Sequence, residues 1–129
     1  MNKICTSIEQ SKRLIELGID VSTADMYYFT IVRDYPYSQG KIKTIAKIMD
    51  GSFSSNYDIP AWSLSALLGL IPDKISINNE TYYLSFTKKR VEFRGPITWD
   101  GQKAKTFEMD NILDAAFEMI CWLKENKKI

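Results

Sequence analysis

The clearest strand signal in the chain lies in residues 74–95, which read KISINNETYYLSFTKKRVEFRG. Apolar and polar side chains alternate along it with a period of two, a pattern typical of strands that bury one face. The two asparagines at residues 78–79 suit a tight hairpin turn because asparagine tolerates a positive φ, and a second turn falls at the lysines of residues 88–89. We therefore predict a three-stranded antiparallel meander, closed by the Gly-Pro pair at residues 95–96.

Helical patterns occur near both ends of the chain. At the start, Thr6 or Ser7 begins a capping-box pattern, and Gly18 suits the left-handed conformation that ends a helix. At the other end, a helix is predicted over about residues 111 to 126, with Asp110 as its cap. The apolar stripe of this helix consists of Ile112, Ala116, Met119, Ile120 and Leu123. We expect the C-terminal helix to cover the sheet.

Between the first helix and the meander the patterns are shorter. Residues 26–33 are aromatic and β-branched, which favours a strand. Residues 41–49 are ambiguous, because the spacing of their isoleucines suits a helix while the residue type suits a strand. A second helix is predicted from Asp58 as its cap, with Pro60 in its first turn, to Leu70.

Length and composition limit the class of protein. A chain of 129 residues is long enough for one hydrophobic core and too short for two ordinary domains. We predict a single α+β domain over residues 1–129, with three helices packed on a small, mainly antiparallel sheet. No run approaches the roughly 20 apolar residues of a membrane-spanning helix, and the first residues lack the pattern of a secretion signal. We therefore expect a cytoplasmic protein that does not bind a membrane.

The residues that usually carry catalysis are scarce. There is no histidine, which removes the commonest general base and the commonest metal ligand. Cys5 and Cys121 are predicted to be reduced thiols, with Cys121 buried on the last helix. Asp114 and Glu118 have the spacing for a shared proton or cation, but an exposed helical face has the same spacing and is the favoured interpretation. We predict no catalytic residue, metal site or cofactor, while carboxylate, lysine or tyrosine chemistry stays open.

The first candidate for binding is the basic turn of the meander, formed by Lys88, Lys89 and Arg90 and followed by Arg94. A hairpin tip with several cations can contact phosphates, and the preceding strand supplies tyrosines for stacking on bases. Lysines at a turn also keep it soluble and protect a sheet edge from pairing, which is the simpler interpretation. Since the formal net charge is only +1, attraction of an acidic partner would have to come from such a local patch.

The second candidate is a set of tyrosines, namely Tyr27, Tyr28, Tyr35 and Tyr37. Tyrosine combines a large contact area with a polar tip, so these residues suit a surface for protein interaction. Alternating tyrosines are also ordinary half-buried strand residues, which is the favoured interpretation.

The apolar helical segments carry a family resemblance. Residues 59–68, IPAWSLSALL, together with residues 113–116, 118–119 and 122–123 near the C-terminus, resemble small proteins encoded by phages and integrated mobile elements of gut bacteria. Residues 11–18 and 23–25 are similar too. That family is uncharacterised, so the resemblance implies a mobile-element origin and brings no activity or catalytic residue.

These observations lead to a ranked set of functional hypotheses. The first is a non-enzymatic accessory protein that acts by binding another macromolecule, either an unidentified protein partner or further copies of itself as a homo-oligomer. The alternative is nucleic-acid binding through the basic turn at residues 88–94, and an enzyme of unfamiliar type ranks last.

Overall fold

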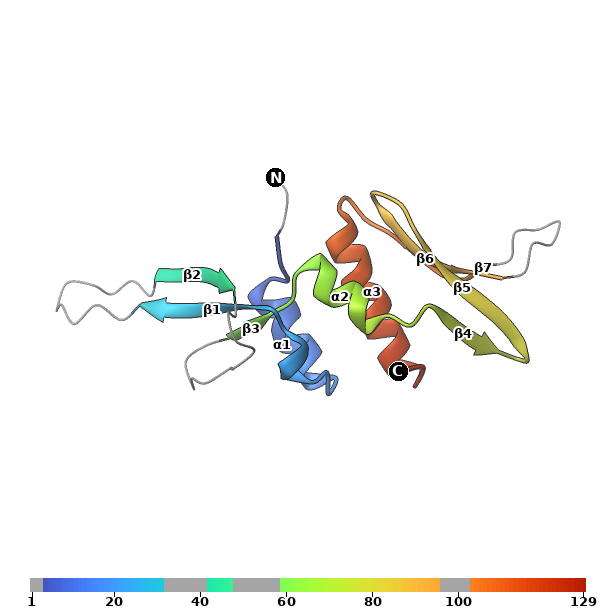
Figure 1. Ribbon diagram of the computed structural model, residues 1–129, viewed down its shortest axis with the longest axis horizontal. Coiled ribbons are helices and arrows are strands. Elements are labelled where there is room, and N and C mark those ends of the chain that lie inside the picture. Colours follow the sequence, from blue (N-terminus) through green and yellow to red (C-terminus); the bar gives the residue numbers. More distant parts are fainter. Residues whose placement is uncertain (1–3, 32–41, 48–58, 96–102) are drawn as a thin grey trace.

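The computed structural model describes residues 4–31, 42–47, 59–95 and 103–129. In chain order its elements are α1 (Ile8–Glu16), a short 3₁₀ helix (Val21–Thr23), β1 (Met26–Ile31), β2 (Ile42–Lys47), β3 (Ile59–Ala61), α2 (Leu64–Leu70), β4 (Lys74–Ile77), β5 (Glu80–Phe86), β6 (Arg90–Arg94), β7 (Lys103–Glu108) and α3 (Ile112–Glu125). The strands form two antiparallel sheets, with the order β2-β1-β3 and β4-β5-β6-β7. The sheets lie at opposite ends of the molecule, and the helices lie between them (Figure 1). The α+β class is therefore confirmed, whereas the prediction of one sheet is wrong.

The predicted meander forms the first three strands of the four-stranded sheet. The turn between β4 and β5 has φ of 51° at Asn78 and 69° at Asn79, so both asparagines adopt the left-handed conformation that this turn needs. The turn between β5 and β6 is closed by the amide of Thr87, which donates to the carbonyl of Arg90 over 2.8 Å.

The meander is not three-stranded, because β7 adds a fourth strand beside β6. The sequence pattern predicts no element at β7. Its register on β6 shifts at Phe93 and Arg94, so one residue of β7 is passed over and the alternation of side chains is interrupted. Half of the residues of β7 are charged, and the strand contains the irregularity itself, so it lacks the regular apolar alternation that marks a strand in a sequence.

The ends of the first and last helices follow local capping rules. At α1 the Ser7 hydroxyl accepts from the amide of Gln10, whose side chain accepts in turn from the Ser7 amide, so the capping box is confirmed. The predicted end at Gly18 is confirmed by a φ of 87°. At α3 the predicted cap Asp110 is wrong by one residue. Asn111 has the extended backbone of a cap, and its side chain accepts from the amide of Asp114.

The predicted start of the second helix is wrong. Residues 59–61 form the short strand β3, which pairs with β1, and α2 begins only after Ser63, whose hydroxyl accepts from the amide of Ala66. Pro60 fits at the edge of a sheet as well as in the first turn of a helix, because proline has no amide hydrogen to donate in either place. Trp62 is consequently outside the helix and fully buried, with its indole Nε1 donating to the Thr23 hydroxyl over 2.9 Å.

The strand interpretation of the ambiguous residues 41–49 is correct, since β2 runs antiparallel to β1 over its full length. The predicted strand at residues 26–33 is confirmed as β1 up to Ile31. Its last two residues lie outside the described part of the chain.

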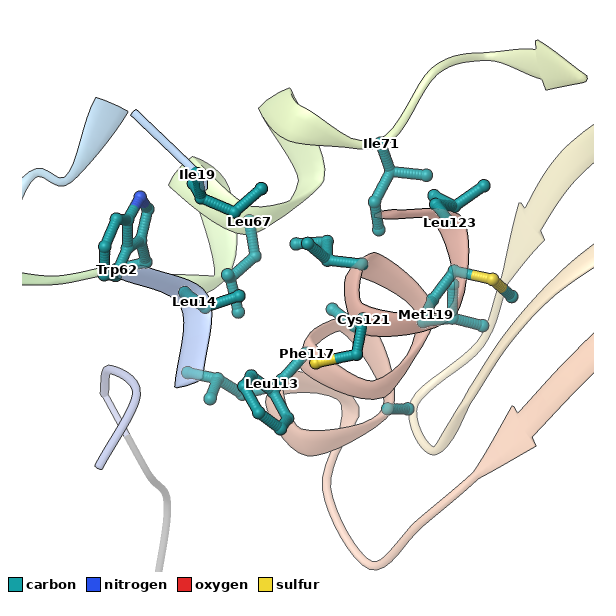
Figure 2. Close-up of a cluster of buried hydrophobic side chains, with 14 of the residues drawn as sticks. Leu14, Ile19, Trp62, Leu67, Ile71, Leu113, Phe117, Met119, Cys121 and Leu123 are labelled. Carbon is teal, nitrogen blue, oxygen red and sulfur yellow. The ribbon is translucent and has the colours of Figure 1, made fainter. Parts of the chain in front are cut away.

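The core is centred on α3, which is buried on almost all sides (Figure 2). The predicted stripe is buried at Ala116, Met119, Ile120 and Leu123, but Leu113, Phe117 and Cys121 are buried as well. The reason is that α3 contacts α2 on one side and β6 and β7 on another, so it has no single apolar face. A smaller cluster, made of Cys5, Met26 and Ala61, lies under the three-stranded sheet. The prediction of one domain over residues 1–129 stays a prediction.

Candidate functional site

The four-stranded sheet has one face on α3 and a second face turned away from it. Val91 and Phe93 of β6 are fully buried in the core beside α3, and successive side chains of a strand point to opposite faces. We call the second face the outer sheet face. By the strand register it carries Lys74, Ser76, Thr81, Tyr83, Ser85, Arg90, Glu92, Arg94, Thr106 and Glu108.

A cation, an aromatic ring and a second cation form a row across the outer sheet face. Lys74 of β4 lies opposite Tyr83 of β5, and Tyr83 lies opposite Arg94 of β6. The Tyr83 side chain is 57% exposed, and Lys74 and Arg94 are exposed as well. Neighbouring strands are about 4.8 Å apart, so both cations flank the tyrosine ring at short range.

A buried carboxylate lies beneath the two arginines of this face. Glu92 Oε1 is 3.5 Å from Nε of Arg94, and its Oε2 is 3.6 Å from Nε of Arg90. The Thr106 hydroxyl donates to Oε2 over 3.2 Å. Glu92 is 1% exposed, whereas the side chains of Arg90 and Arg94 are 35% and 55% exposed. Both guanidinium groups are therefore drawn towards one buried anion and still reach solvent.

The two lysines of the predicted basic turn lie elsewhere. Lys88 and Lys89 are exposed, and they line a cavity of about 250 Å³ at the start of α3. The other residues of its lining are Leu64, Asp110, Asn111, Ile112 and Leu113. The structure thus divides the four predicted cations into a lysine pair beside α3 and an arginine pair on the outer sheet face.

The cavity at the start of α3 contains charges of both signs. Asp110 lines it together with the two lysines, and Asp114 lies in the first turn of α3. The carboxylate of Asp114 accepts from Nε2 of Gln10 over 2.8 Å and from Nδ2 of Asn111 over 2.9 Å. A carboxylate in the first turn offsets the positive end of the helix dipole, so this cavity has little preference for an anion.

The two tyrosines of β5 have different surroundings. Tyr82 faces α3, where it packs against the core and its hydroxyl donates to Glu80 Oε2 over 3.2 Å. Tyr83 faces outward. Of the tyrosines predicted for stacking in the preceding strand, Tyr83 is therefore the one on the same face as the arginines.

The candidate surface of Tyr27, Tyr28, Tyr35 and Tyr37 lies only partly within the described residues, so it stays a prediction. The Tyr28 hydroxyl donates to the carbonyl of Thr6 over 2.8 Å and accepts from the Cys5 thiol over 3.6 Å. Burial, followed by the contact with Cys5, raises the pKa of Tyr28 above its usual value. Tyr27 lies on the opposite face of β1 from Tyr28, while residues 35 and 37 lie outside the described ranges. Tyr28 therefore ties the chain start to β1 and has a structural role.

The remaining reactive groups are held in structural contacts. Asp114 is bonded to Gln10 and Asn111, as above, and Glu118 is half-buried one turn further along α3. Cys5 and Cys121 are both buried and form no disulfide, and burial raises the pKa of Cys121 to about 11. In the part of the chain that the structure describes, no three acidic, cysteine or histidine side chains gather in a way that could hold a metal ion, and none of the helices has the length and apolar content to span a bilayer.

Arg90 and Arg94 belong to the site predicted from the sequence, whereas Lys74 and the buried Glu92 do not. The signal for Lys74 is its parity in the alternating stretch, which places it on the same face as Tyr83 once the 78–79 turn fixes the register. The burial of Glu92 has no such signal, because glutamate flanked by arginines is an ordinary pattern for an exposed strand face.

Comparison with known proteins gives no relative. No family model matches the chain, and no curated protein or solved structure is similar enough to be counted as related. The resemblance to phage and mobile-element proteins therefore stays a prediction from the residues quoted for it.

Proposed function

We propose that this protein is a non-enzymatic accessory protein that binds nucleic acid through its outer sheet face. The observation that carries the proposal is the pair of arginines held over the buried Glu92, next to the row of Lys74, Tyr83 and Arg94. Arginine presents a planar fork of donors that matches phosphate oxygens. The proposed binding surface is therefore the outer sheet face, whereas the sequence predicts the basic turn at residues 88–94.

The charge on this face supports an anionic partner. Three cations whose side chains the structure describes, Lys74, Arg90 and Arg94, lie on it together with two carboxylates. Because Glu92 is buried and engaged with both arginines, Glu108 remains as the one exposed carboxylate among the described residues of the face. A local excess of cations attracts phosphates even though the whole chain has a formal net charge of +1.

The ion pairs of Glu92 also lower the cost of binding. A free arginine loses side-chain entropy when it is fixed on a phosphate, and a side chain that is already oriented loses less. Ion pairing through Nε of each arginine leaves the terminal nitrogens as the natural contacts for a phosphate.

The proposal is tested by the salt dependence of oligonucleotide binding. Fluorescence anisotropy of a labelled 20-nucleotide strand is measured at several salt concentrations. With three phosphate contacts, we expect the logarithm of the association constant to fall with the logarithm of salt with a slope of about −2. K74Q should reduce the slope to about −1.4, since one contact is lost.

K12Q is the matched control, because it removes the same charge from an exposed position on α1, across α3 from the sheet (Figure 1). It should leave both affinity and slope unchanged. The triple variant R90Q/E92Q/R94Q changes the net charge by −1, as K12Q does, yet should abolish most of the binding. Absence of binding by the wild-type protein at low salt, or equal effects of K74Q and K12Q, would exclude this function.

A further inference from the structure

We infer that the outer sheet face selects unpaired nucleic acid over base-paired nucleic acid, with Tyr83 as the residue on which a base stacks. This inference rests on the proposed function and adds that the nucleic acid is single-stranded. Its physical basis is that a base offers its flat face to an aromatic side chain only when it is not already stacked and paired within a duplex.

The position of Tyr83 suits stacking. The ring is 57% exposed and lies in the middle of the row, with Lys74 on one neighbouring strand and Arg94 on the other. A base on the ring would therefore have a cation on each side for the phosphates that precede and follow it. The row thus combines the two elements of single-strand recognition, an aromatic platform and flanking positive charge.

The neighbours of Tyr83 along its own strand are small. Thr81 and Ser85 are the adjacent residues of β5 on the same face, and each has a short polar side chain. They cannot cover the ring as a large side chain would. The face of the ring is therefore accessible from solvent along the strand direction.

The adjacent tyrosine provides an internal comparison. Tyr82 packs against the core on the side of α3, and its hydroxyl is bonded to Glu80. It has the same chemistry as Tyr83 but no place on the outer sheet face. A change at Tyr82 therefore separates the chemistry of tyrosine from its position.

The shape of the face disfavours a duplex. The major groove of double-stranded DNA is about 12 Å wide and admits a helix or a two-stranded ribbon. The outer sheet face extends over four paired strands, about 14 Å between the outer two at the spacing of neighbouring strands. Its central row cannot enter such a groove, so contact with a duplex is restricted to phosphates.

The test compares two probes with equal numbers of nucleotides. One is labelled oligothymidylate of 20 nucleotides, which has little internal structure, and the other is a 10-base-pair duplex. Wild-type protein should bind oligothymidylate at least tenfold more tightly. Y83A should weaken binding of oligothymidylate by about 10- to 100-fold and change duplex binding by less than twofold, because the phosphate contacts remain.

Two further variants separate stacking from other effects. Y83F keeps the ring and should bind oligothymidylate within about twofold of wild type, whereas Y83L keeps apolar bulk and should bind as weakly as Y83A. Y82L removes the aromatic ring on the other face, as Y83L does on the outer sheet face, and should leave binding of both probes unchanged.

The outcomes for the two proposals are distinguishable. If wild-type protein binds neither probe, nucleic-acid binding itself is excluded. A second outcome is that wild-type protein binds both probes equally, Y83A binds as wild type does, and K74Q still weakens binding. In that case selectivity for unpaired nucleic acid is excluded, and nucleic-acid binding by the outer sheet face is retained. Since Tyr83 is largely exposed, Y83A should fold, and its circular dichroism spectrum should match that of wild type.

Discussion

Among the single residues of the candidate site, Glu92 has the largest effect, because both arginines of the outer sheet face pair with its carboxylate. Its carboxylate is nearly inaccessible, and it is compensated by Arg90, Arg94 and the hydroxyl of Thr106. A buried charge with charged partners is costly to disturb, because removal of one member leaves the others without compensation. The same residue therefore stabilises the sheet and orients the proposed binding groups.

The energetic role of Glu92 gives a prediction on stability. E92Q keeps the shape of the side chain and removes its charge, so we expect the free energy of unfolding in urea to fall by about 1–3 kcal/mol. R94Q should cost less than E92Q, because Arg90 and the hydroxyl of Thr106 still compensate the Glu92 carboxylate. Equal stabilities of E92Q and wild type would contradict the account of this residue.

Cys121 gives a prediction on pH dependence. Burial, and after it the nearby Glu118 carboxylate, raises the pKa of this thiol from its ordinary 9.0 to about 11. The folded state therefore holds the proton more tightly than the unfolded state, so this contribution is complete below pH 9 and is lost as the pH rises towards 11. C121A should show a shallower decline of stability over this range.

The decline in C121A should not vanish, because burial also raises the pKa of Tyr28. Urea midpoints of wild type and C121A at a series of pH values between 7 and 11 measure the difference. Two parallel curves would show that the thiol has the same pKa in the folded and unfolded protein.

At the scale of elements, the short helix α2 depends on its cap. Ser63 accepts from the amide of Ala66 and is itself bonded to the carboxylate of Asp25, which also accepts from the Ser63 amide over 2.9 Å. These bonds connect the start of α2 to the segment just before β1. A helix of 7 residues has few internal bonds of its own, so its cap and its packing decide whether it forms.

The cap of α2 can be tested against a serine two residues away. S63A should lower the free energy of unfolding by about 1–2 kcal/mol, since an amide of the first turn and Asp25 both lose a partner. S65A, at an exposed position within α2, should be neutral or raise stability by a few tenths of a kcal/mol, because alanine is the better helix former. A similar loss in both variants would mean that Ser63 does not act as a cap.

Elements with strong local signals could be predicted from the sequence, and those decided by tertiary pairing could not. The asparagine turn and the capping box of α1 depend on residues within a few positions of each other, and both are present as expected. At Pro60 the local signal for a helix is overridden, because pairing of β3 with β1 satisfies the backbone there instead. The fourth strand β7 was missed for the same reason, since its partner β6 and not its own pattern defines it.

The candidate site likewise contains features that local sequence patterns predict and features that depend on tertiary packing. The alternation of residues 74–95 suffices to place Tyr83 on the face opposite the core, and the turn at residues 78–79 brings Lys74 beside it. The separation of the lysine pair from the arginine pair depends on where α3 packs, which no local pattern contains. The sequence therefore indicated a basic hairpin but not which of its faces carries the site.

At the scale of the whole molecule, α3 holds the structure together. It lies between the other helices and the four-stranded sheet (Figure 1). Its buried residues form a large part of the larger core. The three-stranded sheet at the other end lies over a cluster with three buried apolar residues. Stability within one protein follows the amount of buried apolar contact, so the two ends should differ in stability.

This difference predicts a gradient of hydrogen exchange. Backbone amides of α3 and β6 should exchange most slowly, and those of β1 and β2 should exchange faster under native conditions. Exchange followed by mass spectrometry or nuclear magnetic resonance (NMR) reports both groups in one sample. Uniform protection across the chain, or slower exchange in β1 than in α3, would contradict this arrangement of the core.

Binding of unpaired nucleic acid to the outer sheet face can be observed residue by residue in an NMR titration. Amide and side-chain signals of the protein are followed while oligothymidylate is added at low salt. We expect the largest changes at Lys74, Tyr83, Arg90 and Arg94, with little change in α1 or α2. Changes centred on α1 or on the three-stranded sheet, or no change at saturating oligothymidylate, would contradict the account.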